Sequence, residues 1–204
     1  MKIEFKTGEY LVKLARKAGE SWVKYNKAID PIDPIPEQAK MKTGAFVTVK
    51  KHKFTLESLR GCIGYVEGIA PLYEEVILLA KSATQEDPRF PPVKPDELSN
   101  LLFEVTIMTV PEIIYYNTIE ELVSQIKIGR DGLIVEKGFN RGLLLPQVPV
   151  EQNWTIEEFL SYTCRKAYLP VDTWKKTNLT IKKFQGIIFK EKVPGGEVEQ
   201  EVIQ

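Results

Sequence analysis

The chain has 204 residues, enough to bury roughly 70% of the unfolded surface in one substantial core or in two small subdomains. Its 28 Lys and Arg balance 28 Asp and Glu, so the overall charge gives no strong nonspecific attraction to nucleic acid or to an anionic membrane. The composition is that of a globular protein, without an apolar run long enough to cross a bilayer, which excludes a disordered or membrane-spanning chain.

Cysteine usage bears on the cellular compartment. The two cysteines lie far apart in the sequence and do not form a disulfide framework, and no secretory-type apolar stretch occupies residues 1–6. A reducing, cytoplasmic setting is therefore expected.

Residues 8–28 form the first predicted element. Apolar side chains recur there at three- and four-residue spacing, among them Leu11, Leu14 and Trp22, so we expect an amphipathic helix. Three prolines between residues 30 and 37 then favour an extended connector, because proline fixes φ and restricts the residue before it.

The first half of the chain continues as strand, strand, helix and strand. Alternating β-branched residues precede Lys50–Lys53, a polar run that we expect to be a turn. The helix must end by Asp87, because Pro88 disfavours a helical conformation in the residue before it. The predicted elements are a strand over 43–49, a strand over 56–66, a helix from Pro71 and a strand over 103–109.

The second half repeats this order at an offset of about 80 residues. Arg60 and Gly61 align with Arg141 and Gly142. The predicted elements are a strand over 132–136, a turn over 137–140, a strand over 141–148, a helix over 155–167 and a strand over 179–189.

This repetition predicts an α+β fold: two strand-strand-helix-strand repeats that form a mainly antiparallel sheet with helices packed on it, preceded by the N-terminal helix. The expected organisation is a single domain over residues 1–204, made of two subdomains at about 43–110 and about 129–190. The polar tail after Val193 is expected to be loose.

The heptapeptide Leu59–Tyr65 holds the strongest chemical signal. Strand alternation would place Arg60 and Cys62 on one face, and a neighbouring positive charge lowers the pKa of a thiol. Gly61 and Gly64 lack a Cβ, so a ligand or another backbone can approach closely. Cys62 is thus the candidate catalytic residue, with Arg60, Gly61 and Gly64 as candidate substrate-binding residues. The alternative is a cysteine that only fills space in the sheet.

The proline-rich segment Asp87–Pro92 holds the second signal. Its prolines would present Arg89 and Phe90 rigidly, as a recognition surface requires, so Asp87, Arg89 and Phe90 are further substrate-binding candidates. Alternatively, this is a stiff crossover loop in which Arg89 pairs with Asp87 and Phe90 fills the core. Gln147, at the equivalent end of the second repeat, is a candidate hydrogen-bonding group or a simple strand terminus.

The remaining inventory argues against several site types. His52 is the only histidine and is expected in a solvated turn, whereas Cys164 has the spacing of a packed helical position. One histidine with two distant cysteines cannot supply a zinc or iron ligand set, and no glycine-rich phosphate loop is present. No metal and no cofactor are therefore predicted. Asp131, in a predicted turn over 129–132, is a candidate neighbour of the thiol, as is Asp87.

Four motifs together resemble the signature of the AMMECR family, the domain named after the Alport syndrome and midface hypoplasia chromosomal region. The likeness runs from about Thr43 to about Phe189 and is of the stand-alone prokaryotic type. It implies the same two-repeat α+β fold and a pathway shared with radical-SAM and Memo-type proteins, such as modification of RNA or of a metabolite, but no particular reaction. The motifs are Leu59–Tyr65, Asp87–Pro92, Gly129–Leu133 and Leu143–Val148.

Two functions follow from these residues. The first is an enzyme that uses Cys62 in a cleft on a small or nucleotide-like substrate held by Arg60, Arg89 and Phe90. The second is a non-catalytic binding module for a partner protein or nucleic acid, in which Cys62 merely packs. The neutral overall charge leaves nucleic acid open as a partner through a local patch, and no membrane association is expected.

Overall fold

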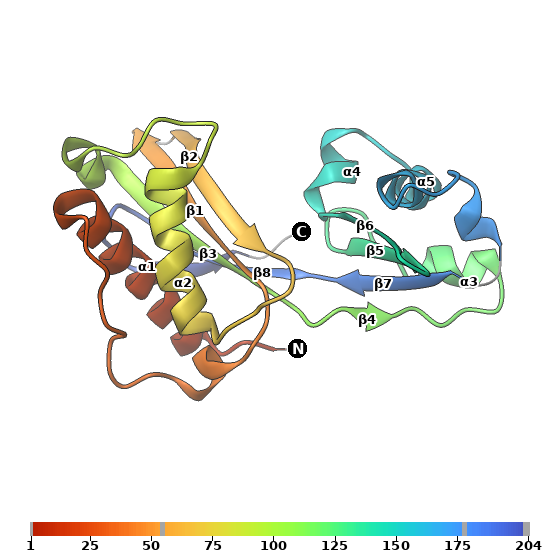
Figure 1. Ribbon diagram of the computed structural model, residues 1–204, viewed down its shortest axis with the longest axis horizontal. Helices are drawn as coiled ribbons and strands as arrows, with labels where there is room; N and C mark the ends of the chain where they lie inside the picture. Colours follow the sequence, from red (N-terminus) through yellow and green to blue (C-terminus); the bar gives the residue numbers. More distant parts are fainter. Residues whose placement is uncertain (1, 54–55, 177–178, 202–204) are drawn as a thin grey trace. The chain divides into compact units, whose positions relative to one another are not determined.

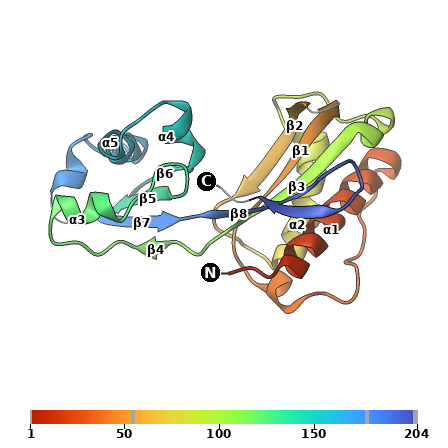
Figure 2. The ribbon, with the colours of Figure 1, turned by 180° about the vertical axis from the view of Figure 1, so that it is seen from behind.

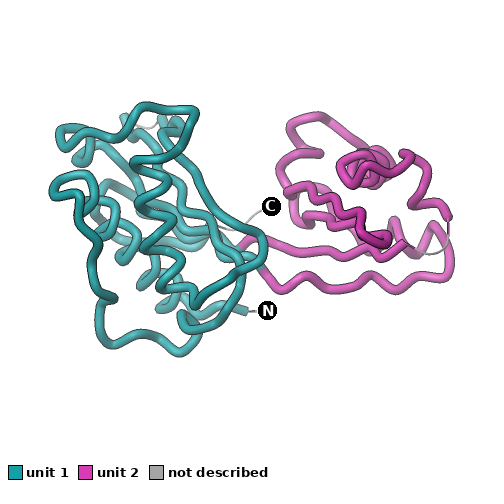
Figure 3. The backbone as a smooth tube through the Cα atoms, viewed as in Figure 1, with its two compact units in different colours: residues 1–108, 187–202 teal, residues 109–186, 203–204 magenta. Residues whose placement is uncertain are grey.

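The computed structural model describes residues 2–53, 56–176 and 179–201 and divides into two compact units (Figure 3). Unit 1 contains Met1–Met108 and Ile187–Val202, and unit 2 is built on Thr109–Gly186. The chain thus leaves unit 1 in mid-sequence and returns to it near the end. None of the helices in the described ranges is long and apolar enough to cross a membrane.

Unit 1 is built on a five-stranded sheet with the order β2-β1-β3-β8-β9 (Figures 1 and 2). Its β1 strand pairs antiparallel with both β2 and β3, and β8 pairs antiparallel with β9. The bounds are β1 Ala45–Lys53, β2 Leu56–Tyr65, β3 Leu101–Met108, β8 Gly186–Glu191 and β9 Val198–Glu201.

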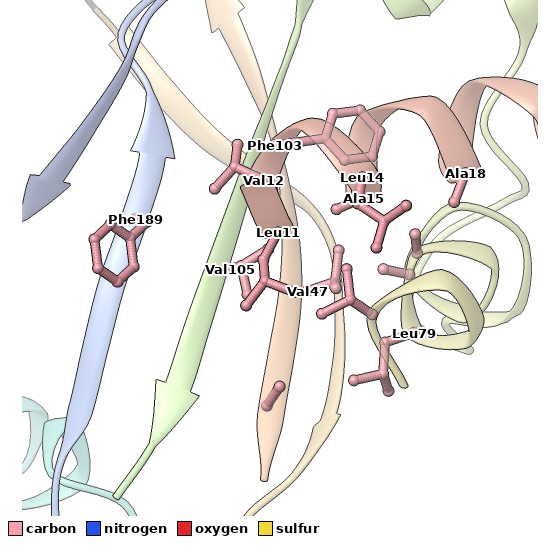
Figure 4. Close-up of a cluster of buried hydrophobic side chains, with 14 of the residues drawn as sticks. Leu11, Val12, Leu14, Ala15, Ala18, Val47, Leu79, Phe103, Val105 and Phe189 are labelled. Carbon is pink, nitrogen blue, oxygen red and sulfur yellow. The ribbon is translucent and has the colours of Figure 1, made fainter. Parts of the chain in front are cut away.

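Two helices, α1 (Phe5–Tyr25) and α2 (Leu72–Lys81), form the core of unit 1 with this sheet. Alternate strand residues such as Val47 and Val105 meet Leu11 and Leu79 of the helices, all fully buried or nearly so (Figure 4). The apolar periodicity of each element determines which of its sides faces inward. The shorter helical segments are η1 Glu37–Lys40, η2 Ser82–Glu86, which continues α2 as a wider turn, and η3 Pro95–Asn100.

Unit 2 is built on a four-stranded sheet with the order β4-β7-β5-β6. The helix α5 (Ile156–Lys166) begins at a capping box of Thr155 and Glu158 and packs on β5 and β6 around Phe159 and Trp174. The other bounds are β4 Glu112–Ile113, β5 Gly132–Lys137, β6 Asn140–Leu144, β7 Thr180–Phe184, α3 Ile119–Ser124, α4 Gln147–Glu151 and η4 Thr173–Lys175.

The two sheets repeat one arrangement. In unit 1 the order β2-β1-β3 places the first strand of the hairpin in the middle, and β6-β5-β7 does the same in unit 2. The aligned glycines have one role: a Cβ on Gly61 would lie 2.0 Å from the carbonyl oxygen of Ala83, and a Cβ on Gly142 would lie 2.3 Å from the backbone nitrogen of Ala167. Each lets an edge strand approach the end of the following helical segment. The two strand-strand-helix-strand repeats are confirmed.

The first strand is longer than predicted. Lys50–Lys53 belongs to β1 and is not a turn, because the ammonium groups pair with carboxylates of neighbouring elements. Lys50 pairs with Glu104 at 2.8 Å and Lys51 with Glu97 at 3.4 Å. The N-terminal helix, predicted over 8–28, begins and ends three residues earlier.

Three predictions for the second half of the chain are also wrong. The strand predicted over 141–148 ends at Leu144, because the helical φ and ψ of Pro146 start α4. The strand predicted over 179–189 is two strands in different sheets, interrupted at Gln185, whose side chain binds Asp131. The tail predicted to be loose after Val193 forms β9 as far as Glu201, which pairs with Lys190 at 3.2 Å, and residues 202–204 lie outside the described residues.

Candidate functional site

The thiol of Cys62 lies on β2, the edge strand of unit 1. The register of β1 and β2 shifts between Val49, which faces Gly61, and Lys50, which faces Leu59. Arg60 is therefore the extra residue of a β-bulge, and an extra residue reverses the alternation of side chains beyond it. The prediction that alternation places Arg60 and Cys62 on one face is wrong.

Arg60 holds the proline-rich segment. Its guanidinium, only 6% exposed, donates two hydrogen bonds of 2.9 Å to the carboxylate of Glu97 and others to the carbonyl oxygens of Pro91 (2.8 Å) and Pro92 (3.3 Å). The hydrogen bonds that Glu97 accepts, chiefly those from Arg60 and also those from the Lys94 N–H and the Lys51 ammonium, lower its pKa to about 2. The Arg60 charge is thus used inside the protein and does not serve the thiol.

Asp87 and Arg89 bind the backbone of Cys62. The Cys62 N–H donates to Asp87 Oδ2 at 2.8 Å, and Arg89 Nη2 donates to the Cys62 carbonyl oxygen at 2.9 Å. The same guanidinium donates to both carboxylate oxygens of Asp87, at 3.0 and 2.7 Å. We call this arrangement the Asp87–Arg89 clasp. It satisfies two backbone groups that an edge strand leaves free.

The clasp contains a buried carboxylate that stays ionised. Asp87 is 4% exposed. The hydrogen bond from Arg89 holds the pKa of Asp87 well below its usual range against the opposing effect of burial, and the backbone N–H groups of Cys62 and Arg89 add to this. The arginine-aspartate pairing is the one expected of a stiff crossover loop.

The thiol itself is half-buried and accepts a hydrogen bond from Thr48 Oγ1 at 3.2 Å. Burial raises the pKa of Cys62, and the charges of Glu104 and Asp87 raise it further. The bond from Thr48 and the charge of Arg89 oppose this shift but do not reverse it. The direction is opposite to the one predicted, and the thiol is protonated at neutral pH.

The neighbouring candidates contact other parts of the chain. A Cβ on Gly64 would lie 2.3 Å from the carbonyl oxygen of Ala45, so this glycine, like Gly61, admits another backbone. Phe90 is half-buried, with the guanidinium carbon of Arg89 5.6 Å from its ring centre. The close approach predicted for these glycines is made by the chain itself.

Within unit 1, His52 lies away from the thiol. His52 is in β1 opposite Glu57, four residues from Thr48, which is roughly 13 Å along a strand. Asp131 belongs to unit 2, is fully buried and accepts hydrogen bonds from Arg130, from Gln185 and from the Lys127 N–H; these bonds outweigh burial and lower its pKa.

Two further predictions concern unit 2. Cys164 is fully buried in the core there, as its helical spacing predicted. Gln147 is exposed at the start of α4, and its placement beside Cys62 stays a prediction. Within residues 2–53, 56–176 and 179–201, no three His, Cys, Asp or Glu side chains are grouped so as to hold a metal ion.

Exposed apolar side chains follow the clasped edge of unit 1. Leu56, Leu59 and Tyr65 of β2 are 76%, 42% and 50% exposed, and Ile69, in the loop after the strand, is 80% exposed. We call these four residues the β2 edge. Apolar groups so placed are typical of a surface that binds another protein. The sequence does not reveal this exposure, because apolar side chains in a strand are more often buried than exposed.

Unit 2 contains a cavity of about 340 Å³ that the predicted sites do not include. It contains a stacked pair of rings, Trp154 and Tyr162, with centres 4.1 Å apart and planes at 6°. Aromatic residues interleaved with cations over residues 154–168 were the signal that could have found it. The cavity is lined by Leu144, Trp154, Tyr162, Arg165, Lys166 and Tyr168.

Comparisons with known proteins find relatives along almost the whole chain. The AMMECR1 family model matches residues 12–189. A protein of Thermofilum pendens is 46% identical over 203 residues, covering 97% of this chain and 95% of that protein. Protein PH0010 of Pyrococcus horikoshii is 47% identical over 200 residues, covering 98% and 97%.

A solved structure supports the fold. The crystal structure of the uncharacterized protein PH0010 matches with a TM-score of 0.79 at 46% identity, covering 98% of this chain and 99% of that chain. The prediction of an α+β fold with an N-terminal helix and antiparallel sheets is confirmed.

Proposed function

From the premise that the chain belongs to the AMMECR1 family, we propose that it is a non-catalytic binding module whose β2 edge docks a partner protein in the cytoplasm. One observation carries the proposal: the clasp occupies the Cys62 backbone while four large apolar side chains stay exposed along that edge. An edge protected against indiscriminate strand pairing, yet apolar, suits a specific protein surface.

The charges at the predicted site support a binding role rather than a catalytic one. Both arginines that would activate the thiol are paired with carboxylates, Arg60 with Glu97 and Arg89 with Asp87. A thiol whose pKa is raised is a poor nucleophile at neutral pH, because the thiolate is the reactive form. The partners proposed are the radical-SAM and Memo-type proteins that the family resemblance implies.

A binding experiment with these two proteins, purified from the same organism, tests the proposal. We expect biolayer interferometry to detect a complex. Leu56→Lys or Ile69→Lys should weaken this complex at least about tenfold, because each variant replaces an apolar contact by a charge that the interface would bury. The matched control is Tyr25→Lys, 73% exposed on unit 1 but away from β2. Parent-like binding by both edge variants, or no complex with either protein, contradicts the proposal.

A second candidate is an enzyme that uses Cys62 on a small or nucleotide-like substrate. The specific observation in its favour is that the thiol is only half-buried and accepts a hydrogen bond from Thr48. The nearby Arg89 side chain is 53% exposed. In this function Arg89 and Phe90 would hold the substrate, and Arg60 would act only by fixing their loop.

Alkylation separates the two functions. In a Cys164→Ser background, where Cys62 is the only thiol, the enzyme would show fast alkylation at neutral pH and protection by a co-purified ligand. The binding module would show slow alkylation that rises only at alkaline pH. Loss of a co-purified ligand in Arg89→Ala, with unfolding unchanged, would favour the enzyme.

A further inference from the structure

The cavity in unit 2 combines flat aromatic surface with positive charge. Trp154, just before α5, stacks on Tyr162 within the helix, and Tyr162 is still 37% exposed. A stacked pair with an accessible ring offers a rigid platform on which a further flat ring can stack. The cavity volume of about 340 Å³ falls within the range of roughly 300–1,000 Å³ common for small-ligand sites.

The charge beside this platform is not neutralised by the protein. Arg165 and Lys166 lie three and four residues after Tyr162, so all three side chains share one face of α5. Both cations line the cavity and are exposed, and neither forms an ion pair with any residue of the described ranges. In unit 1, by contrast, Arg60 and Arg89 are both paired with carboxylates.

A third ring borders the cavity at a position where a side chain is unusual. Tyr168 follows the last turn of α5 with φ of +57° and is 92% exposed. Its N–H donates to the Arg165 carbonyl and the Leu169 N–H to that of Cys164, which is the helix ending that glycine usually occupies. The exposed tyrosine therefore stands at a strained position with its ring at the cavity.

We propose that this cavity binds a nucleobase that carries a phosphate group, either as a free nucleotide or within single-stranded nucleic acid. The base stacks on the Trp154–Tyr162 pair and Tyr168, and the phosphate binds Arg165 and Lys166. This goes beyond the proposed function, since it concerns unit 2 and a different class of ligand.

Two probes test the proposal with the full chain: adenosine monophosphate and a fluorescein-labelled oligoadenylate of about eight nucleotides, in about 50 mM salt. We expect saturable binding of the oligonucleotide by anisotropy, weakened about tenfold in Tyr162→Leu by the loss of stacking. Arg165→Gln and Lys166→Gln should each reduce the slope of log affinity against log salt by about 0.7. Displacement of the oligonucleotide by an equal concentration of the mononucleotide assigns the free nucleotide as ligand, and failure to displace it assigns the single strand.

The controls are Phe139→Leu and Lys137→Gln, exposed residues of the same unit that line no part of this cavity. If Tyr162→Leu does not fold, the salt slopes of the two exposed cation variants still decide. Absence of saturable binding of either probe, or parent-like affinity and salt slope in both cation variants, overturns the proposal. Ile69→Lys should bind the oligonucleotide like the parent protein. Because this variant alters the β2 edge and not the cavity, failure of the proposed docking function can be told from failure of nucleotide binding.

Discussion

The edge strands β2 and β6 hold equivalent places in the two repeats and have different surroundings. Beside β2, the segment after the helix returns as the Asp87–Arg89 clasp and binds the Cys62 backbone. Beside β6, Leu144 and the residues at the end of α5 line an open cavity with aromatic and cationic walls. The same topology thus supports a closed edge in one unit and an open one in the other.

The difference shows which features of the repeat are tied to the backbone. Gly61 and Gly142 occur in both copies, because any side chain there would enter the neighbouring backbone. The aligned arginines diverge: Arg60 is buried against Glu97, whereas Arg141 pairs with Glu136 with 43% of its side chain exposed. Close backbone contacts are shared, and side-chain chemistry at the edges is not.

The largest loss of stability is expected when either of the two aligned glycines is replaced. Gly61→Ala and Gly142→Ala should each destabilise their own unit by about 3 kcal/mol, since the new Cβ would lie 2.0 or 2.3 Å from backbone atoms. Hydrogen exchange measured by mass spectrometry reports each unit separately, which is needed because two units need not unfold together.

Gly138→Ala is the matched control for that comparison. Its φ is +61° but no atom lies within 4 Å of the added Cβ, so only the conformational cost of about 1 kcal/mol is expected. If Gly142→Ala costs no more than this control, the structural parallel between the two repeats is broken.

The next effect removes the clasp. Asp87→Ala should cost about 2–3 kcal/mol, because the Cys62 N–H loses its partner and Arg89 loses the carboxylate. Exchange of the Cys62 amide proton should accelerate most. The control Glu9→Ala removes an exposed pair with Lys13 and should cost less than about 0.5 kcal/mol. An unchanged Cys62 amide in Asp87→Ala would contradict the role given to the clasp.

Sequence patterns predicted the repeated elements and their order, because periodicity depends on which side of each element is buried. They did not predict the bulge at Arg60, since one inserted residue reverses the faces without changing the composition of the strand. The Arg60–Glu97 pair joins residues 37 apart, and no local pattern encodes it. The charges of Lys50–Lys53 indicate a turn when the sequence is considered alone, because carboxylates that pair with Lys50 and Lys51 belong to β3 and η3, far along the chain.

A smaller change in stability is expected when the ion pairs of the aligned arginines are weakened, and this change depends on pH. The pKa of Glu97 is lowered to about 2, so its ionised form stabilises the fold above its ordinary pKa of 4.5, and this stability is lost as pH falls from about 4.5 through 2. Glu97→Gln should therefore cost about 1–2 kcal/mol at pH 7 and almost nothing near pH 2. Denaturant unfolding across this range measures the difference.

The corresponding change in unit 2 is Glu136→Gln, which weakens a more exposed pair with Arg141 and also the pair with Lys182. Solvent screening limits its cost to less than about 1 kcal/mol at pH 7. Equal costs for Glu97→Gln and Glu136→Gln would mean that burial does not distinguish the two arginines.

The smallest effect sharpens the comparison at the thiol, where unit 1 has Cys62 and unit 2 has Leu143. Thr48→Val removes the hydroxyl that donates to the sulfur, and because this bond opposes the effect of burial, its loss raises the pKa of Cys62 further. In a Cys164→Ser background, alkylation at pH 8 should therefore slow by about two- to fivefold. A faster reaction would contradict the role given to this hydrogen bond, because valine has nearly the same shape as threonine and leaves access to the sulfur unchanged.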